Sequence, residues 1–299
     1  MREMVNPLAG GGRSLASRVR PDGLPGLDVR WIHGAPDCAL SADPPLQVYA
    51  YDKDTYILRQ SKCTHFEAPF LYLLFGTEKA LLIDTGAGTV PVRSVVEGIV
   101  EQWQAIHDRP GLELVVAHSH GHEDHIAGDD QFRGRPGTTL VEPGLAAIER
   151  FFGFRSWPEE PAGFDLGERE LTLIPVPGHM GDLTLDDHFA VYDAQTQLML
   201  SGDVFYPGFL SVRDGQAYGR SIERLVHFAA GHRVRYFLGC HIEMTRMKGL
   251  AYRSGTTYQP LEHVLELRPR HLSELHATLE AMGGELTRTV LDHFILEPV

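Results

Sequence analysis

The chain has 299 residues, of which 43% are hydrophobic and 22% are charged, so it can build a large core and does not have the composition of a disordered protein. Its 40 acidic residues against 27 basic ones give a formal net charge of −13, which would repel a phosphate backbone and disfavours a nucleic-acid partner. No stretch approaches the roughly 18 apolar residues that a membrane-spanning helix needs, so no membrane partner is expected either.

The three cysteines, Cys38, Cys63 and Cys240, are odd in number, widely spaced and without a C-x-x-C pair. This pattern favours reduced thiols over a disulfide framework. The first thirty residues also lack the apolar segment of a secretory signal. We therefore expect a cytoplasmic protein with free cysteines.

In chain order, residues 1–28 are rich in Gly, Pro, Ser and Arg without periodicity, and we interpret them as an irregular N-terminal arm. Residues 29–299 are interpreted as a single catalytic domain. In its first half, alternating or continuous apolar runs predict strands at 29–32, 47–51, 55–58, 70–75, 80–84, 112–117 and 138–141. Apolar residues at helical spacing predict helices at 92–107 and 145–152.

The second half repeats this mixture of elements. Strands are predicted near 171–176, 188–193, 198–201 and 236–239, with a helix near 222–230. The tail is predicted to hold a helix at 270–282 and a final strand at 287–296. Strands and helices that interleave through two halves of similar size indicate an α/β fold.

A histidine-rich segment, residues 118–128, directly follows the predicted strand at 112–117. Within it, His120, His122, Asp124 and His125 form the pattern H-x-H-x-D-H. Imidazole suits zinc, copper, iron and nickel, and a carboxylate adds a hard oxygen donor. Four such donors within six residues are too many for one small ion, so the segment predicts two adjacent metal ions.

Other polar residues stand where predicted strands end, which is where a rigid scaffold presents functional side chains. Asp84 ends the strand at 80–84 and precedes a glycine loop. It is placed either to cap the next helix or to accept a hydrogen bond from a metal-bound imidazole, and we favour the second role. His179, Asp203 and His241 follow three further strands and are candidate ligands.

These motifs together resemble the metallo-β-lactamase superfamily. Asp84 in Ile-Asp-Thr-Gly, the H-x-H-x-D-H loop, His179 in Pro-Gly-His, Asp203 in Ser-Gly-Asp and His241 occur in that family's order and approximate spacing, over roughly residues 45–245. The resemblance implies a four-layer αβ/βα sandwich with metals at one sheet edge. It also implies that one metal is held by His120, His122 and His179, the other by Asp124, His125 and His241, with Asp203 as a bridge.

A bridging Asp203 departs from the true β-lactamases of the superfamily and is similar to the glyoxalase II and acyl-homoserine lactonase branches. The expected cofactors are two divalent metal ions, with zinc first and iron or manganese as alternatives. Two cations about 3.5–4 Å apart make hydroxide available near pH 7. The expected activity is therefore attack by a metal-bridging hydroxide on the carbonyl of a small ester or lactone.

Two alternatives stay open. One is a thioester hydrolase similar to glyoxalase II, and the other is a mono-iron oxidoreductase similar to the persulfide dioxygenases. The expected partner is a small-molecule substrate, and a homodimer is compatible with the sequence. The substrate itself would be selected by the loops at 66–70, 151–161 and 206–218.

Two residues near the ligands are candidates for direct catalysis. Asp124 is a carboxylate beside the attacking water and could transfer a proton. Tyr206, three residues after Asp203, either donates a hydrogen bond to the developing oxyanion or packs under its loop. Lactonases of the superfamily are similar in having a tyrosine at this offset.

Several neighbouring residues are expected to lie at the margins. His118 is predicted to be a strand-end residue, Glu123 to face solvent or the pocket rim, and Cys240 to be a buried thiol facing away from the metals. Residues 63–67 are predicted to form a loop bordering the substrate pocket. The tail histidines, among them His263 and His271, have no partners in sequence.

Overall fold

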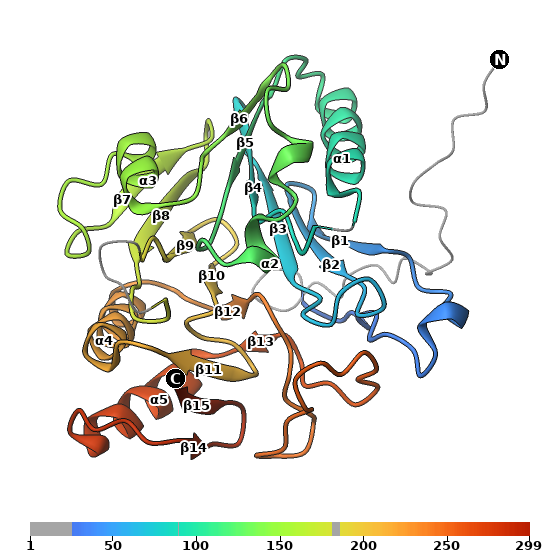
Figure 1. Cartoon of the computed structure of the whole chain (residues 1–299). Coiled ribbons are helices and arrows are strands. Elements are labelled where there is room, and N and C mark those ends of the chain that lie inside the picture. Colours follow the sequence, from blue (N-terminus) through green and yellow to red (C-terminus); the bar gives the residue numbers. More distant parts are fainter. Residues whose placement is uncertain (1–25, 89, 181–185) are drawn as a thin grey trace.

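The computed structural model describes residues 26–88, 90–180 and 186–299. Most of the expected N-terminal arm, residues 1–25, lies outside these ranges, and residues 26–28 have no regular structure. The described residues form two six-stranded sheets and one three-stranded sheet, together with helices (Figure 1). None of these helices is long and apolar enough to cross a membrane.

The first sheet comes from the first half of the chain and has the order β1-β2-β3-β4-β5-β6. Neighbours from β1 to β4 are antiparallel, whereas β4, β5 and β6 run parallel. Its strands are β1 (Leu46–Asp52), β2 (Thr55–Gln60), β3 (Phe70–Phe75), β4 (Lys79–Ile83), β5 (Glu113–Ala117) and β6 (Thr138–Leu140).

The second sheet comes from the second half and has the order β13-β12-β10-β9-β8-β7. Here β10 and β12 run parallel, and the other neighbours are antiparallel. Its strands are β7 (Ala162–Asp165), β8 (Glu170–Pro175), β9 (Phe189–Asp193), β10 (Leu198–Gly202), β12 (Tyr236–Gly239) and β13 (Glu266–Leu267). Because β8 and β10 are both antiparallel to β9, the strands β8, β10 and β12 end at the same edge.

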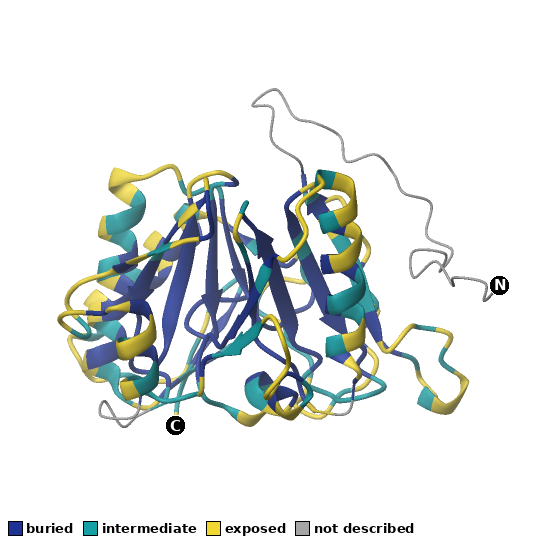
Figure 2. Cartoon of the chain, turned by 90° about the horizontal axis from the view of Figure 1, so that it is seen from above, coloured by how far each residue is buried: buried dark blue, intermediate teal, exposed yellow. Residues whose placement is uncertain are grey.

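Side chains that alternate along each strand explain why the two sheets pack face to face. In β3, Phe70, Tyr72 and Leu74 belong to the core between the sheets, whereas Leu71 and Leu73 belong to the core under helix α1 (Val92–His107). A strand that is apolar at every position is thus buried on both faces. Figure 2 shows the buried strands of both sheets between helices whose outer faces are exposed.

The outer face of the second sheet is covered by helices α4 (Gly215–Gly231) and α5 (Pro269–Met282). The remaining helices are the short α2 (Glu123–Ile126) and α3 (Leu145–Phe152). A small sheet of β11 (Phe209–Val212), β15 (Ile295–Pro298) and β14 (Thr289–Val290) completes this half. The order helix, sheet, sheet, helix confirms the predicted four-layer α/β sandwich.

Local differences from the sequence predictions have identifiable causes. Helix α4 begins earlier than predicted because the Asp214 side chain caps it by accepting a hydrogen bond from the Ala217 N–H. The expected single strand at 287–296 is instead the antiparallel pair β14 and β15. The expected strand at 29–32 is absent, and β7, β11 and β13 were not predicted.

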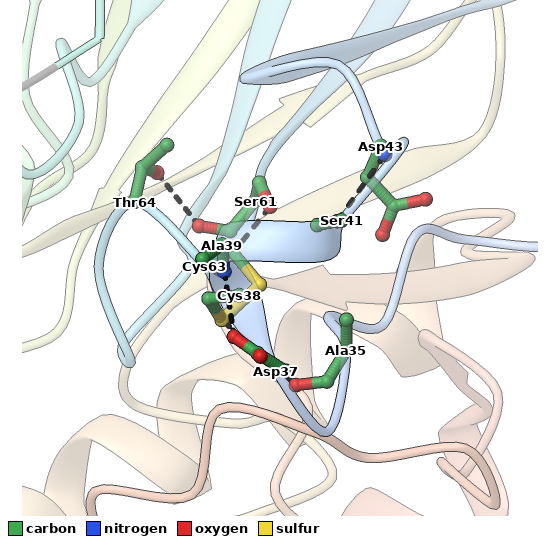
Figure 3. Close-up of a disulfide and its surroundings, with 9 residues drawn as sticks. All are labelled: Ala35, Asp37, Cys38, Ala39, Ser41, Asp43, Ser61, Cys63 and Thr64. Carbon is green, nitrogen blue, oxygen red and sulfur yellow. Dashed lines mark hydrogen bonds between the residues drawn. A yellow bond between two sulfur atoms is a disulfide. The ribbon is translucent and has the colours of Figure 1, made fainter.

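The structure joins Cys38 and Cys63 in a disulfide, with their Cα atoms 5.1 Å apart (Figure 3). Cys38 begins the short 3-10 helix η1 (Cys38–Leu40), and Cys63 lies in the loop after β2. The antiparallel pairing of Leu46 with Gln60 brings the segments beyond these strand ends together. The expectation of reduced thiols was therefore wrong for this pair, and it is met only by the buried Cys240.

Candidate metal centre

The predicted ligands come together where strands of both sheets end. The histidine-rich loop follows β5, and Asp84 follows the parallel neighbour β4. From the second sheet, His179 follows β8, Asp203 follows β10 and His241 follows β12. Their donor atoms form two groups of a kind that could hold a metal ion, one with His120, His122, His179 and Asp203, the other with Asp124, His125 and His241.

The first group is centred on three imidazoles. Nδ1 of His122 lies 2.9 Å from Nε2 of His120 and 3.2 Å from Nε2 of His179. The Asp203 Oδ2 atom lies 3.8 Å from Nε2 of both His120 and His179. Nitrogen lone pairs and a carboxylate oxygen thus face a common point.

The second group combines one carboxylate with two imidazoles. The Asp124 Oδ2 atom lies 3.4 Å from Nε2 of His125 and 3.3 Å from Nε2 of His241. Asp203 also reaches this group, because its Oδ2 is 3.5 Å from His125 Nε2 and its Oδ1 is 3.4 Å from His241 Nε2. Asp203 therefore lies between the two groups, where the resemblance implies a bridging ligand.

In four of these imidazoles the Nδ1 atom, which points away from the donor group, has a hydrogen-bond partner. Nδ1 of His125 contacts Asp84 Oδ2 at 2.9 Å, and Nδ1 of His120 contacts Ser119 Oγ at 3.1 Å. Nδ1 of His179 contacts the Ser211 carbonyl at 2.8 Å, and Nδ1 of His241 contacts the Glu67 carbonyl at 3.1 Å. Partners of this kind fix the tautomer of a metal-bound histidine, leaving Nε2 free to bind.

Distances within the groups suit divalent cations. Donors held about 2.0–2.1 Å from a tetrahedral zinc ion lie about 3.4 Å from one another, close to most of the separations given above. Moreover, His125 Nε2 and Asp203 Oδ1 are buried and have no hydrogen-bond partner in the described parts of the chain. Buried polar atoms are rarely left without a partner, so these two fit the role of metal ligands.

The pKa values of the histidines are shifted in opposite directions in the two groups. Burial lowers the pKa of His120 well below its ordinary value and that of His122 to about 4, which keeps both rings neutral and able to donate a lone pair. Burial opposes charge on His125 and His241 too, but the surrounding carboxylates raise the pKa of both rings well above the ordinary value. Burial alone would raise the pKa of Asp203, but the same imidazoles hold it well below its ordinary range.

Asp84 makes hydrogen bonds that suit the supporting role predicted for it. Its buried carboxylate accepts hydrogen bonds from His125 Nδ1, from the Ser119 N–H at 2.7 Å and from Ser119 Oγ at 3.0 Å. Asp84, His125 and Cys240 also lie close enough to suggest a third metal group. Asp84 is already occupied by these donors, and burial raises the pKa of the Cys240 thiol, so hydrogen bonding explains this group better.

Tyr206 packs against the second group, with its ring centroid 5.7 Å from that of His241. Its hydroxyl donates to the Phe209 carbonyl at 2.6 Å and lies 3.2 Å from Glu243 Oε2. Glu243 in turn accepts a hydrogen bond from the Phe209 N–H at 2.7 Å. Donation to a substrate oxyanion would therefore require the hydroxyl to exchange its backbone partner, and the catalytic role of Tyr206 stays a prediction.

Four further features near the donor groups, predicted to lie at their margins, differ in how they contact the centre. His118 is buried and contacts Asp129 Oδ1 through Nε2 at 2.8 Å, and it belongs to neither ligand group. Glu123 is exposed, as expected. Cys240 is buried as predicted, but its thiol does not face away from the centre, because Sγ lies 3.3 Å from Asp84 Oδ2. The loop at 63–67 reaches the centre through the Glu67 carbonyl.

Sequence reasoning missed three consecutive buried residues, Asp186, Asp187 and His188, that lie against the ligand loops. Their side chains contact glycine N–H groups and an imidazole ring, so no metal-ligand spacing could have revealed them. The backbone carbonyls of Ser211 and Glu67 left no trace in the sequence pattern at all.

Comparison with solved structures gives an independent view of the fold. A metallo-β-lactamase from Pontibacter korlensis superposes with a TM-score of 0.51 at 18% identity, over 79% of this chain and 99% of that protein. TMB-1 gives 0.51 at 15% identity, over 81% and 100%. DIM-1 metallo-β-lactamase gives 0.50 at 14% identity, over 81% and 99%. No protein-family model and no curated protein sequence matches the chain.

The chain thus has the metallo-β-lactamase fold. At these identities the likeness shows the architecture alone, in agreement with the superfamily resemblance drawn from the motifs. The glyoxalase II and lactonase branch is a finer assignment, which depends on the chemistry of the site.

Proposed function

We propose that the protein is a dinuclear metal-dependent hydrolase that cleaves a small ester or lactone. The observation that supports this most directly is the convergence of seven side chains into two donor groups that share Asp203. Zinc is the metal that we expect, because imidazole and carboxylate ligands suit it, with iron or manganese as the alternatives. Bound divalent cations would polarise the carbonyl and lower the pKa of water.

The chain's own residues would orient the substrate and move protons. Asp124 is the best placed to transfer a proton, because its side chain is 19% exposed whereas that of Asp203 is 9% exposed. It would accept a proton from the attacking water and release it to the leaving alkoxide. Asp84 and the Glu67 and Ser211 carbonyls would hold the imidazoles in place through this cycle.

Metal removal is the first test. We expect about two metal equivalents per chain, loss of activity on chelation, and recovery with zinc. His179→Asn should lower the metal content, whereas His118→Asn is the matched control because its buried imidazole is outside both groups. A metal-replete protein that is inert to esters, lactones and thioesters would contradict the proposal.

A substrate panel separates the finer alternatives. Esters and lactones are the expected substrates, while preference for a thioester would assign a glyoxalase II-like activity. A β-lactam belongs in the panel because a solved neighbour, DIM-1, is described as exposed to ceftazidime. One iron per chain together with oxygen consumption on a persulfide would replace hydrolysis by oxidation.

The cellular location and the partners of the protein also stay predictions. The cytoplasmic location was inferred from reduced thiols, and the Cys38–Cys63 disulfide removes that support, because disulfides persist mainly in oxidising compartments. A small-molecule substrate, the absence of a nucleic-acid partner and the homodimer stay predictions.

A further inference from the structure

Asp186, Asp187 and His188 precede β9 and have no part in the function proposed above. All three are buried, with 0%, 2% and 0% of their surface exposed. Two adjacent carboxylates at such a depth are costly unless each finds hydrogen-bond donors. Their donors identify what the segment does.

Asp187 is bound to the histidine-rich loop. Its Oδ1 accepts a hydrogen bond from the Gly121 N–H at 3.1 Å, and its Oδ2 accepts one from the Gly144 N–H at 2.6 Å. Gly121 separates His120 from His122, so this carboxylate fixes the peptide between two predicted ligands. Gly144 lies just before α3, so the same carboxylate links the histidine-rich loop to the start of that helix.

Asp186 is bound to the loop that carries the third ligand. Its Oδ2 accepts hydrogen bonds from the Gly178 N–H at 2.7 Å and the Met180 N–H at 3.3 Å, which are the residues on either side of His179. Gly178 has a φ of +124°, and a Cβ there would lie 2.3 Å from the Tyr218 nitrogen. The loop is therefore held in a conformation that glycine alone adopts readily.

His188 packs against His120 of the first donor group. Its ring stacks on that of His120, with centroids 4.5 Å apart and an interplanar angle of 18°. His188 belongs to none of the donor groups, and its nitrogens have no hydrogen-bond partner among the described residues, so the contact that it makes with His120 is ring stacking. A Cβ on Gly202, the residue before Asp203, would lie 2.3 Å from His188 Nε2, which shows how closely this ring also approaches the bridging position.

We propose that Asp186, Asp187 and His188 are positioning residues that set the metal affinity of the first group much more than that of the second. The inference rests on the proposed dinuclear centre. Asp187 holds the peptide between His120 and His122, Asp186 holds the residues on either side of His179, and His188 stacks on His120. In the second group, by contrast, His125 and His241 are held by Asp84 and the Glu67 carbonyl. Loss of such supporting contacts typically lowers metal affinity about 10–100-fold.

The test is a zinc titration of the metal-free full-length chain against a chromophoric chelator, repeated with cobalt, whose visible absorption reports the geometry at each site. In Asp186→Ala, Asp187→Ala and His188→Ala we expect one metal equivalent to bind about 10–100-fold more weakly and the other to change much less. Asp187→Asn should fall between wild type and Asp187→Ala, because its amide oxygen keeps one of the two backbone bonds. Asp165→Ala is a control on the exposed surface, since it removes a hydrogen bond between a carboxylate and the Gly167 N–H outside the centre.

The outcomes separate this inference from the function on which it rests. A wild-type chain that binds fewer than two metals would overturn both. A wild-type chain that binds two metals, with variants that bind them equally well, would overturn the positioning role alone. Weakening of both equivalents by the same factor would assign the segment to general stability, and it would also refute selective positioning.

Discussion

Asp84→Asn should disturb both metal groups through one side chain. Asp84 contacts His125 directly and reaches His120 through Ser119, whose hydroxyl donates to Asp84 and accepts from the His120 ring. In the asparagine variant, an amide NH₂ that faces His125 would favour the tautomer with the proton on Nε2, the atom needed for metal binding. We expect about 10–100-fold weaker zinc binding, which corresponds to about 1.4–2.8 kcal/mol at each site.

Asp129→Asn is the matched control, because Asp129 is a buried carboxylate in contact with His118, which is not a predicted ligand. This variant should keep its zinc affinity even where its stability falls. The assay is competition with a chelator on metal-free protein, with unfolding by urea measured in parallel. Equal zinc affinities for wild type and Asp84→Asn would refute the role assigned to Asp84, and so would equal losses in the two variants.

Three further outcomes are expected. Tyr206→Phe should lower kcat by about tenfold or more with its metal content unchanged, and an unaltered kcat/KM would limit the hydroxyl to its bond with the Phe209 carbonyl. Arg169→Met should lower the free energy of unfolding, measured in urea, by about 3–5 kcal/mol, because it leaves the buried Asp193 carboxylate without its cationic partner. A loss below about 1 kcal/mol would contradict this. Burial, together with nearby His293 and Arg270, lowers the pKa of His271 from an ordinary value of 6.5 to about 4. The folded protein therefore binds a proton here less readily than the unfolded chain, so stability falls as the pH drops from 6.5 towards 4. Urea unfolding at pH 7 and pH 5 should therefore show a smaller difference in His271→Gln than in wild type.

The side chains that meet at the candidate metal centre could be identified from the sequence because each one belongs to a local pattern. Four lie within six residues, and His179, Asp203 and His241 each follow an apolar strand. The strands themselves were recognisable because their residues are buried on both faces, as in β3. Local patterns of this kind survive in the sequence because strand ends determine where side chains emerge.

The other features of the fold and the site depend on contacts between residues far apart in the sequence, which no local pattern predicts. The Cys38–Cys63 pairing follows from the register of β1 with β2, which a count of three cysteines does not contain. The tail histidines also find partners only in three dimensions, where His263 Nε2 lies 2.9 Å from His293 Nδ1 and His271 stacks on His293. Asp186 and Asp187 act on backbone N–H groups, so their partners have no residue identity to detect.

The division of the ligands between the two sheets has a consequence for how the protein matures. One sheet presents the histidine-rich loop, while the other presents His179, Asp203 and His241. Neither half of the chain can therefore assemble a complete donor set before the sheets dock. A truncated chain without the second sheet would keep the four donors of the histidine-rich loop but would have the complete donor set of neither group.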